Sequence, residues 1–376
     1  MSGAGGLAEA LAARTAALCA IPSPIGEERA LCDAVEREAL ARFPRVERVK
    51  NSLVVWVDGA GPPPPSPPPG ERAGERGPLL LLCGHLDTVP IHAEDLGRFP
   101  RREGGRLFAP GSSDMKSGVA VALELAERLP RAERVFELAL VLYAREEGPF
   151  AENELGDVLR EVPELPRAAL AICLEPTDGV LQLGCVGSIH ATISFAGRSA
   201  HSARPWQGEN AVHRAGALLA HLAERPPREA VSGGLVFREV LSATRIEGGR
   251  ARNVVPDHCT LNLNFRFGPD RTLADAADEL RRLALAHGAT AELTDLSPAC
   301  AAYADHPLVR RLIERTGATV EPKQAWTDVA RLAAAGVPAV NFGPGATAQA
   351  HQAGEWVEVE AIARCYRALE AFLRVP

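Results

Sequence analysis

The chain has 376 residues, a net charge of −7 and a composition that is 46% hydrophobic and 24% charged. This length predicts two domains, and the charge provides no basic surface for nucleic acid. No apolar run approaches the ~20 residues that cross a bilayer, the N-terminus lacks the basic start of a signal peptide, and eight cysteines without a CxxC pair favour a reducing compartment. We therefore expect a cytoplasmic protein with no nucleic-acid or membrane partner.

Apolar strands alternate with amphipathic helices at both ends of the chain. The expected helices are at 7–20, 26–43 and 116–129, and the expected strands are at 53–57, 79–83, 135–143, 168–174 and 337–342. A proline-rich stretch at 62–69 predicts an extended surface loop between two strands, with a PxxP ligand for a partner as the alternative. Strands that alternate with helices favour an α/β fold with a doubly wound, mostly parallel sheet.

The pattern changes in the middle of the chain. Half-exposed strands and helices follow one another in the order β-α-β-β-α-β, at 189–195, 209–224, 236–246, 258–266, 271–287 and 290–294. This order is typical of a ferredoxin-like split unit. We therefore expect an inserted α+β domain at 178–294, within a catalytic α/β domain formed by 1–177 and 295–376.

Metal-binding side-chain types follow the ends of the predicted strands. Four of them, His85, Glu147, Glu175 and His351, each follow a separate strand, and Asp114 opens a helix. Each residue alone has an ordinary structural explanation, but ligands of an open α/β sheet gather outside the carboxyl ends of its strands. Histidine nitrogen with carboxylate oxygen suits zinc, with cobalt, manganese or iron(II) as alternatives. A carboxylate at position 114 can bridge two such ions.

Two further acids have expected roles beside these ligands. Asp87 lies two residues after His85 in an extended segment, so both side chains point to the same face and the carboxylate can accept the second ring N–H. Glu146 directly precedes Glu147, and two adjacent carboxylates at a strand end are costly without a cation to neutralise them, the alternative being two solvated acids of a loop. One of the pair is then a ligand, and the other can take a proton from water and pass it to a leaving amine.

These motifs, in this order and spacing, resemble the dizinc aminoacylase/carboxypeptidase family of metallohydrolases. The segments that carry the resemblance are at 84–90, 113–118, 146–148, 175–177, 200–203 and 350–352. The resemblance implies that two Zn²⁺ ions are held by His85 with Glu175, and by Glu147 with His351, that Asp114 bridges them, and that Glu146 is the general acid/base. It also implies that the inserted domain is a lid and homodimerisation module, whose His201 reaches the partner subunit's site and stabilises an oxyanion.

Within this family, a second set of segments is similar to the desuccinylases of the actinobacterial type. They lie at 183–187, 200–205, 253–256, 264–267, 326–331 and 340–345. This similarity implies hydrolysis of the amide of N-succinyl-LL-2,6-diaminopimelate, with Asn253 and Arg266 contacting substrate carboxylates, for which arginine provides a bidentate fork. The alternatives are another N-acyl amino acid deacylase, of the acetylornithine deacetylase kind, or a carboxypeptidase. An alternative of a different class is a non-catalytic metal-binding scaffold.

Overall fold

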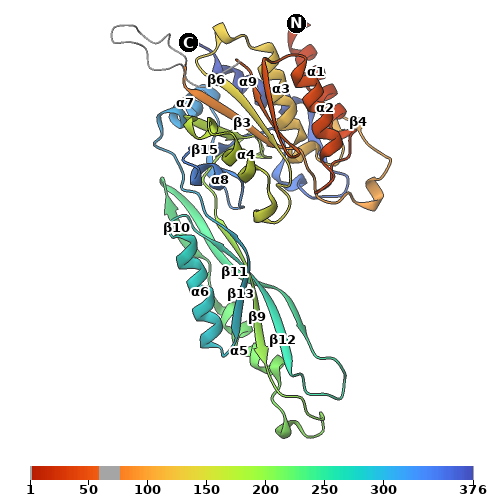
Figure 1. Cartoon of the computed structure of the whole chain (residues 1–376), viewed down its shortest axis with the longest axis vertical. Coiled ribbons are helices and arrows are strands. Elements are labelled where there is room, and N and C mark those ends of the chain that lie inside the picture. Colours follow the sequence, from red (N-terminus) through yellow and green to blue (C-terminus); the bar gives the residue numbers. More distant parts are fainter. Residues whose placement is uncertain (1, 59–76, 376) are drawn as a thin grey trace. The chain divides into compact units, whose positions relative to one another are not determined.

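The computed structural model describes residues 2–58 and 77–375, so the proline-rich stretch at 62–69 lies outside the described residues. The chain forms two compact units (Figure 1). Unit 1 comprises the described residues of Met1–Leu183, Tyr303–Glu321 and Arg331–Pro376, and unit 2 comprises Gly184–Ala302 and Pro322–Ala330. The sequence placed the insertion at 178–294, whereas unit 2 begins six residues later because a short strand, β8 (Leu181–Leu183), still belongs to the sheet of unit 1.

Unit 1 is built on an eight-stranded sheet in the order β1-β2-β6-β3-β7-β15-β8-β14. Its other strands are β1 (Arg45–Val49), β2 (Ser52–Trp56), β3 (Leu79–His85), β6 (Glu137–Tyr143), β7 (Leu170–Cys173), β14 (Val320–Pro322) and β15 (Ala339–Asn341). The central strands β6, β3, β7 and β15 are parallel, with antiparallel β2 and β8 on either side of them. Every residue of β2, β3 and β6 is buried, so the sheet is covered on both faces.

The register of the parallel strands decides where their ends lie. His85 at the end of β3 pairs with Tyr143 at the end of β6, and Cys83 pairs with Cys173 at the end of β7. The segments that follow these three strands therefore leave the sheet at the same edge. This arrangement confirms the predicted parallel sheet and brings the loops after the strands together.

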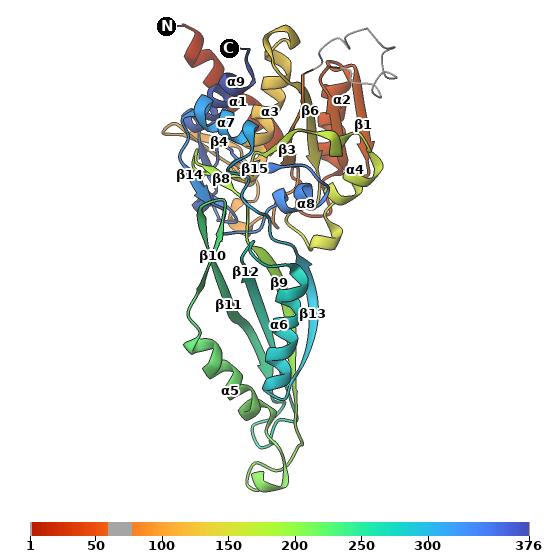
Figure 2. The same ribbon diagram turned by 90° about the vertical axis from the view of Figure 1, so that its left-hand side faces the viewer.

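The helices of unit 1 cover this sheet. They are α1 (Ser2–Cys19), α2 (Arg29–Leu40), α3 (Ser117–Arg128), α4 (Leu155–Glu161), α7 (Pro307–Thr316) and α9 (Val359–Leu373), while α8 (Val329–Ala334) crosses the boundary between the units. Arg14 of α1 ties the layer together through ion pairs of 3.0 Å to Glu38 of α2 and 2.8 Å to Glu127 of α3. Helices α1, α3 and α9 also pack against one another (Figure 2).

A small three-stranded sheet, in the order β16-β5-β4, completes unit 1. Its strands are β4 (Arg101–Glu103), β5 (Arg106–Phe108) and β16 (Trp356–Glu358). The pairing of Trp356 with Phe108 brings the segment that precedes β16 beside the segment that follows β5. These two segments contain residues of the candidate site.

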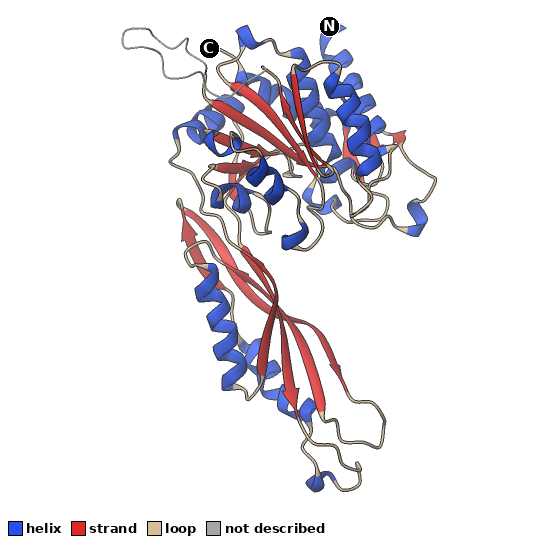
Figure 3. Ribbon diagram, viewed as in Figure 1, coloured by secondary structure: helices blue, strands red, loops and turns tan. Residues whose placement is uncertain are grey.

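Unit 2 is an antiparallel sheet with two helices, in contrast to the mixed α/β arrangement of unit 1 (Figure 3). Its elements are β9 (Gly187–Ala196), α5 (Ala211–Glu224), β10 (Arg228–Ser232), β11 (Leu235–Gly248), β12 (His258–Phe267), α6 (Leu273–Ala286) and β13 (Thr290–Ser297). The sheet order β11-β12-β9-β13 is that of a ferredoxin-like unit, and β10 extends it by one hairpin strand. The predicted inserted α+β unit is thereby confirmed.

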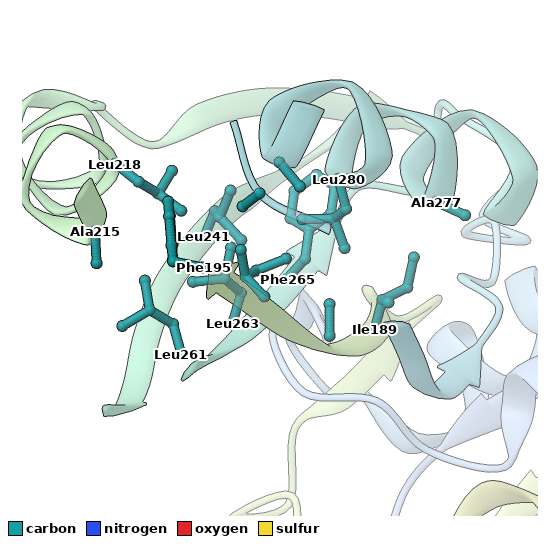
Figure 4. Close-up of a cluster of buried hydrophobic side chains, with 14 of the residues drawn as sticks. Ile189, Phe195, Ala215, Leu218, Leu241, Leu261, Leu263, Phe265, Ala277 and Leu280 are labelled. Carbon is teal, nitrogen blue, oxygen red and sulfur yellow. The ribbon is translucent and has the colours of Figure 1, made fainter. Parts of the chain in front are cut away.

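The core of unit 2 lies between one face of the sheet and its two helices (Figure 4). Ile189, Phe195 and Phe265 point from the strands toward Leu218 of α5 and Leu280 of α6. The alternate positions of β9 and β12 are polar and half-buried, as the period of two in the sequence predicts. Among the helices of the described residues, none combines the length and the apolar character that spanning a bilayer requires.

Candidate metal centre

Five of the predicted ligands come together in unit 1 as two groups that share one residue. The first group is His85, Asp114 and Glu175, and the second is Asp114, Glu147 and His351. In each group, one nitrogen or oxygen atom per residue lies within 4.8 Å of the others. This clustering follows from the register of β3, β6 and β7, whose carboxyl ends lie at the same edge of the sheet.

Asp114 is placed so that its two oxygens face different histidines. Oδ1 lies 3.1 Å from Nε2 of His85, and Oδ2 lies 3.9 Å from Nε2 of His351. The turn that carries Asp114 needs Gly111, which has a φ of 76° and where a Cβ atom would lie only 2.6 Å from Thr88 Cγ2. A carboxylate held between two ligand groups has the arrangement of a residue shared by two metal ions.

The contact expected between the carboxylate of Asp87 and the ring of His85 is not the one that forms. Nδ1 of His85 lies 3.0 Å from the backbone carbonyl oxygen of Asp87, while the nearer carboxylate oxygen is 3.6 Å away. The carboxylate instead accepts the backbone N–H groups of Glu146 and Glu147, at 3.1 and 3.0 Å. It does so because the loop after β6 passes beside the end of β3, and two amide donors compete with the ring for its oxygens.

Asp87 therefore orients both sides of the site. Its carbonyl oxygen fixes the ring of His85 with Nε2 toward Asp114, and its buried carboxylate fixes the backbone of the acid pair. Glu146 belongs to a further overlapping group with His85 and Glu147. The general acid/base candidate thus lies beside both ligand groups, but it is not one of the three residues of either group.

Both histidines of the metal groups have raised pKa values. Burial alone lowers the pKa of His85, but the hydrogen bond to Asp114 and the charges of Asp87 and Asp114 outweigh it, so that this pKa lies well above its usual value. The hydrogen bond from His351 to Glu147 raises the pKa of His351. Metal ligation requires neutral imidazole, so a metal ion that binds here has to displace these protons.

We expect metal loading at neutral pH to release protons, and metal affinity to decline as the pH falls. Because both pKa values are raised, protons compete with the metal ion at neutral pH and not only below the usual histidine pKa of about 6.5. Calorimetric titration of the metal-free protein with Zn²⁺ at pH 7, in two buffers of different ionisation enthalpy, measures this release. The observed enthalpies should differ between the buffers, and equal enthalpies would contradict the expectation.

The remaining predicted site residues belong to unit 2. His201 is exposed, and its Nδ1 accepts the N–H of Ala203 at 3.1 Å. Asn253 is also exposed, and its backbone carbonyl accepts the N–H of Ser202 at 2.9 Å, so the two candidates lie on adjacent segments. All residues of the metal groups belong to unit 1, so His201 and Asn253 form a separate cluster in unit 2.

Arg266 lies on the polar face of the sheet of unit 2. Its Nε donates to Oδ1 of Asn264 at 2.9 Å, and the amide nitrogen of Asn264 lies 2.8 Å from Nε2 of His190. Burial lowers the pKa of Arg266, against the opposing charge of Asp295. A half-buried guanidinium that is oriented by a neutral amide is suited to bind an anionic group.

Comparison with known proteins identifies the family. Residues 81–375 match the family described as peptidase family M20/M25/M40. The chain belongs to this family. A Mycobacterium tuberculosis protein with the provisional name of succinyl-diaminopimelate desuccinylase is 39% identical to this chain over 360 residues. The alignment covers 96% of each chain. The succinyl-diaminopimelate desuccinylase of Corynebacterium glutamicum is 35% identical over 368 residues, with 96% of this chain and 95% of the relative covered.

Solved structures of the M20 family share this fold. The crystal structure of an M20 family metallo-carboxypeptidase from Sulfolobus solfataricus superposes with a TM-score of 0.72, although it is only 16% identical, and the alignment covers 99% of this chain and 98% of that chain. The α/β unit with its separate antiparallel sheet is therefore the fold of this family.

Sequence reasoning missed one residue of this M20 site. Glu355 is buried, and its carboxylate accepts backbone N–H groups from Gly111, Ser113 and Asp114. Burial raises the pKa of Glu355 to about 7 despite these donors. The only signal in the sequence was an acid four residues after His351, just before the apolar residues Trp356 and Val357.

Proposed function

We propose that this member of peptidase family M20 hydrolyses N-succinyl-LL-2,6-diaminopimelate to succinate and LL-diaminopimelate. The observation that carries the proposal is the pair of ligand groups that share Asp114 beside Glu146. The near end-to-end likeness to the desuccinylase of Corynebacterium glutamicum supports the choice of substrate. We further propose that the protein acts in the cytoplasm, where the eight buried cysteines, all without disulfides, would stay reduced.

The cofactor that we propose is a pair of Zn²⁺ ions, for which Co²⁺ or Mn²⁺ could substitute. Nitrogen and carboxylate oxygen donors without a thiolate fit this choice. His85, Glu175 and Asp114 would hold one ion, and Glu147, His351 and Asp114 would hold the other. When bound, the two ions would polarise the amide carbonyl and lower the pKa of water.

Glu146 handles the protons of the proposed reaction. Its carboxylate takes a proton from the attacking water and returns it to the amide nitrogen, so that the C–N bond breaks. The carboxylic acid that forms then gives its remaining proton to the released amine, which leaves succinate and an ammonium group. Asp87 holds the backbone of Glu146 while this occurs, because its buried carboxylate accepts the N–H of that residue at 3.1 Å. The acid and the ligands are thus oriented before substrate arrives.

Stabilisation of the oxyanion is assigned to His201, acting in a homodimer formed through unit 2. Nδ1 of His201 accepts the N–H of Ala203, so the neutral ring carries its proton on Nε2. An exposed imidazole with an Nε2–H donor can bond a developing oxyanion on the partner subunit. Asn253, on the adjacent segment, is assigned to a substrate carboxylate.

A substrate panel tests this function. Metal-loaded protein is given N-succinyl-LL-diaminopimelate, N-acetylornithine and a set of N-acyl amino acids and dipeptides, and kcat/KM is compared. The proposal predicts a clear preference for the succinylated substrate. Preference for N-acetylornithine or for a dipeptide would contradict the proposed substrate but not the assignment as a metallohydrolase. Bound metal without activity on any substrate would favour a non-catalytic scaffold.

Removal of the Arg266 guanidinium should weaken substrate selection. We expect Arg266→Ala to lower kcat/KM for the succinylated substrate by about 10- to 100-fold, since a hydrogen bond to a charged group contributes ~1.5–3 kcal/mol. The matched control is Arg238→Ala, which removes an exposed arginine of β11 in the same unit. Equal effects of the two substitutions would argue against a substrate carboxylate at Arg266.

A further inference from the structure

We infer that Glu355 is a positioning residue, which holds the shared ligand Asp114 in register with the segment that carries His351. The inference rests on the proposed two-metal site and adds to it a residue that is not itself a ligand. Glu355 lies four residues after His351 and directly before β16. Its side chain is buried in unit 1, and the residue is 6% exposed.

One carboxylate binds the backbone on both sides of the shared ligand. Oε2 of Glu355 accepts the N–H of Gly111 at 2.6 Å, and Oε1 accepts the N–H groups of Ser113 and Asp114 at 2.6 and 2.9 Å. Three backbone donors thus converge on the two oxygens of a single buried side chain. The carboxylate therefore acts as a three-point anchor for the turn.

The turn needs an acceptor from outside its own backbone. Asp114 has φ −119° and ψ 96°, and Met115 has φ −133° and ψ 34°, so helical hydrogen bonding is interrupted where the ligand side chain leaves the chain. Buried N–H groups without a partner are costly, and Glu355 supplies the oxygens that a regular helix would have provided. With these donors satisfied, the backbone of Asp114 can adopt the conformation that directs its two oxygens apart.

The backbone of the segment that carries Glu355 is also held in place by hydrogen bonds. The backbone carbonyl of Glu355 accepts the N–H of Ala109 at 3.0 Å, and Trp356 pairs with Phe108 in the small sheet. The N–H of Gly354 is bonded by both carboxylate oxygens of Asp95, at 3.1 and 3.0 Å. Because the backbone of Glu355 is fixed, its side chain can hold the turn at Asp114 in a defined position relative to this segment.

The consequence concerns both metal groups. Asp114 belongs to each of them, and His351 belongs only to the second, at 3.9 Å from Asp114 Oδ2. Without the three-point anchor, the backbone of the turn can change its conformation. Asp114 can then keep its contact with His85, whose Nε2 lies 3.1 Å from Oδ1, and lose its position beside His351. The second group would then lose its shared ligand, although every ligand side chain is still present.

Cobalt substitution tests this role, because the magnetic coupling between two bound Co²⁺ ions would not change if Glu355 served only the stability of the fold. Metal-free wild type, Glu355→Gln and Glu355→Asp are titrated with Co²⁺, and electron paramagnetic resonance measures magnetic coupling between the two ions through a shared carboxylate. The glutamine has the same size but turns an amide N–H₂ toward backbone donors, while aspartate keeps both oxygens on a shorter stem. The matched control is Glu358→Gln, which alters a side chain that is 49% exposed and three residues away.

We expect Glu355→Gln to bind the second Co²⁺ equivalent about 10- to 100-fold more weakly, the range typical of residues that orient metal ligands, and to lose the coupling at two equivalents. Glu355→Asp should be intermediate, and Glu358→Gln should match wild type. A folded Glu355→Gln with wild-type affinities and coupling would overturn the inference. A wild type that binds fewer than two Co²⁺ ions would instead overturn the proposed two-metal site, so the two failures are distinguishable.

If the Glu355 variants do not fold, a measurement on the wild-type protein still tests the inference. Hydrogen exchange of the metal-free wild type, resolved by amide, should find that the N–H groups of Gly111, Ser113 and Asp114 exchange far more slowly than the same amides in an unfolded chain. Rapid exchange at these three positions would overturn the three-point anchor, whatever the variants do.

Discussion

Glu146→Gln is expected to lower kcat by about 10²- to 10⁴-fold, the usual contribution of a general acid/base, while both metal ions stay bound. The reason is geometric. Glu146 lies with His85 and Glu147 in a group that overlaps both ligand groups, yet neither of those groups depends on it. Glutamine keeps the size and the backbone contact to Asp87, and removes only the ability to take a proton.

The measurement combines steady-state kinetics with metal content by elemental analysis. Glu152→Gln is the matched control, because Glu152 is an exposed acid of the same loop, paired with Arg145 and 51% exposed. Turnover near wild type in Glu146→Gln would remove the general-base assignment. Loss of metal together with turnover would make Glu146 a ligand, which its group with His85 and Glu147 allows.

Asp114→Ala is expected to lower the occupancy of both metal groups, whereas His351→Ala lowers that of one. Asp114 is the only residue common to the two groups, and its oxygens lie 3.1 Å from His85 Nε2 and 3.9 Å from His351 Nε2. His351, at 2.8 Å from Glu147, serves only the second group. Activity should fall to background in Asp114→Ala, since a two-metal site needs both ions.

Equilibrium dialysis against Zn²⁺ measures the metal-to-protein ratio of each variant, with circular dichroism as the check of folding. Asp305→Ala, which alters an acid that is 90% exposed, is the control. Identical ratios in Asp114→Ala and His351→Ala would contradict the assignment of Asp114 as the shared ligand. An unchanged ratio in His351→Ala would remove His351 from the ligand set.

The strands that position the ligands could be predicted from the sequence because they are apolar throughout. A run such as Leu79–Cys83 is apolar on both faces, which is typical of a central parallel strand, and His85 at its end then lies at the edge of the sheet. Strands that are very short or rich in charged residues carry no such signal. β1 is rich in charged residues, and β4, β5, β8, β14 and β16 are three residues long, so none of them was predicted.

Hydrogen-bond partners were harder to predict than positions. The alternation of an extended segment placed Asp87 on the same face as His85, but it could not decide that two backbone N–H groups, those of Glu146 and Glu147, would take the carboxylate. Glu355 was missed for a related reason. It bonds the N–H of a residue 244 positions away in the sequence, and no local pattern predicts such a contact.

Release of primary amine from N-succinyl-LL-diaminopimelate is the measurement that tests the central claim most directly. Protein loaded with Zn²⁺ is assayed before chelation, after chelation and after Zn²⁺ is restored, with Glu146→Gln alongside. The account predicts amine release that chelator abolishes, that Zn²⁺ restores, and that the variant lacks. Metal-loaded, folded protein that releases no amine from this substrate would contradict the proposed function.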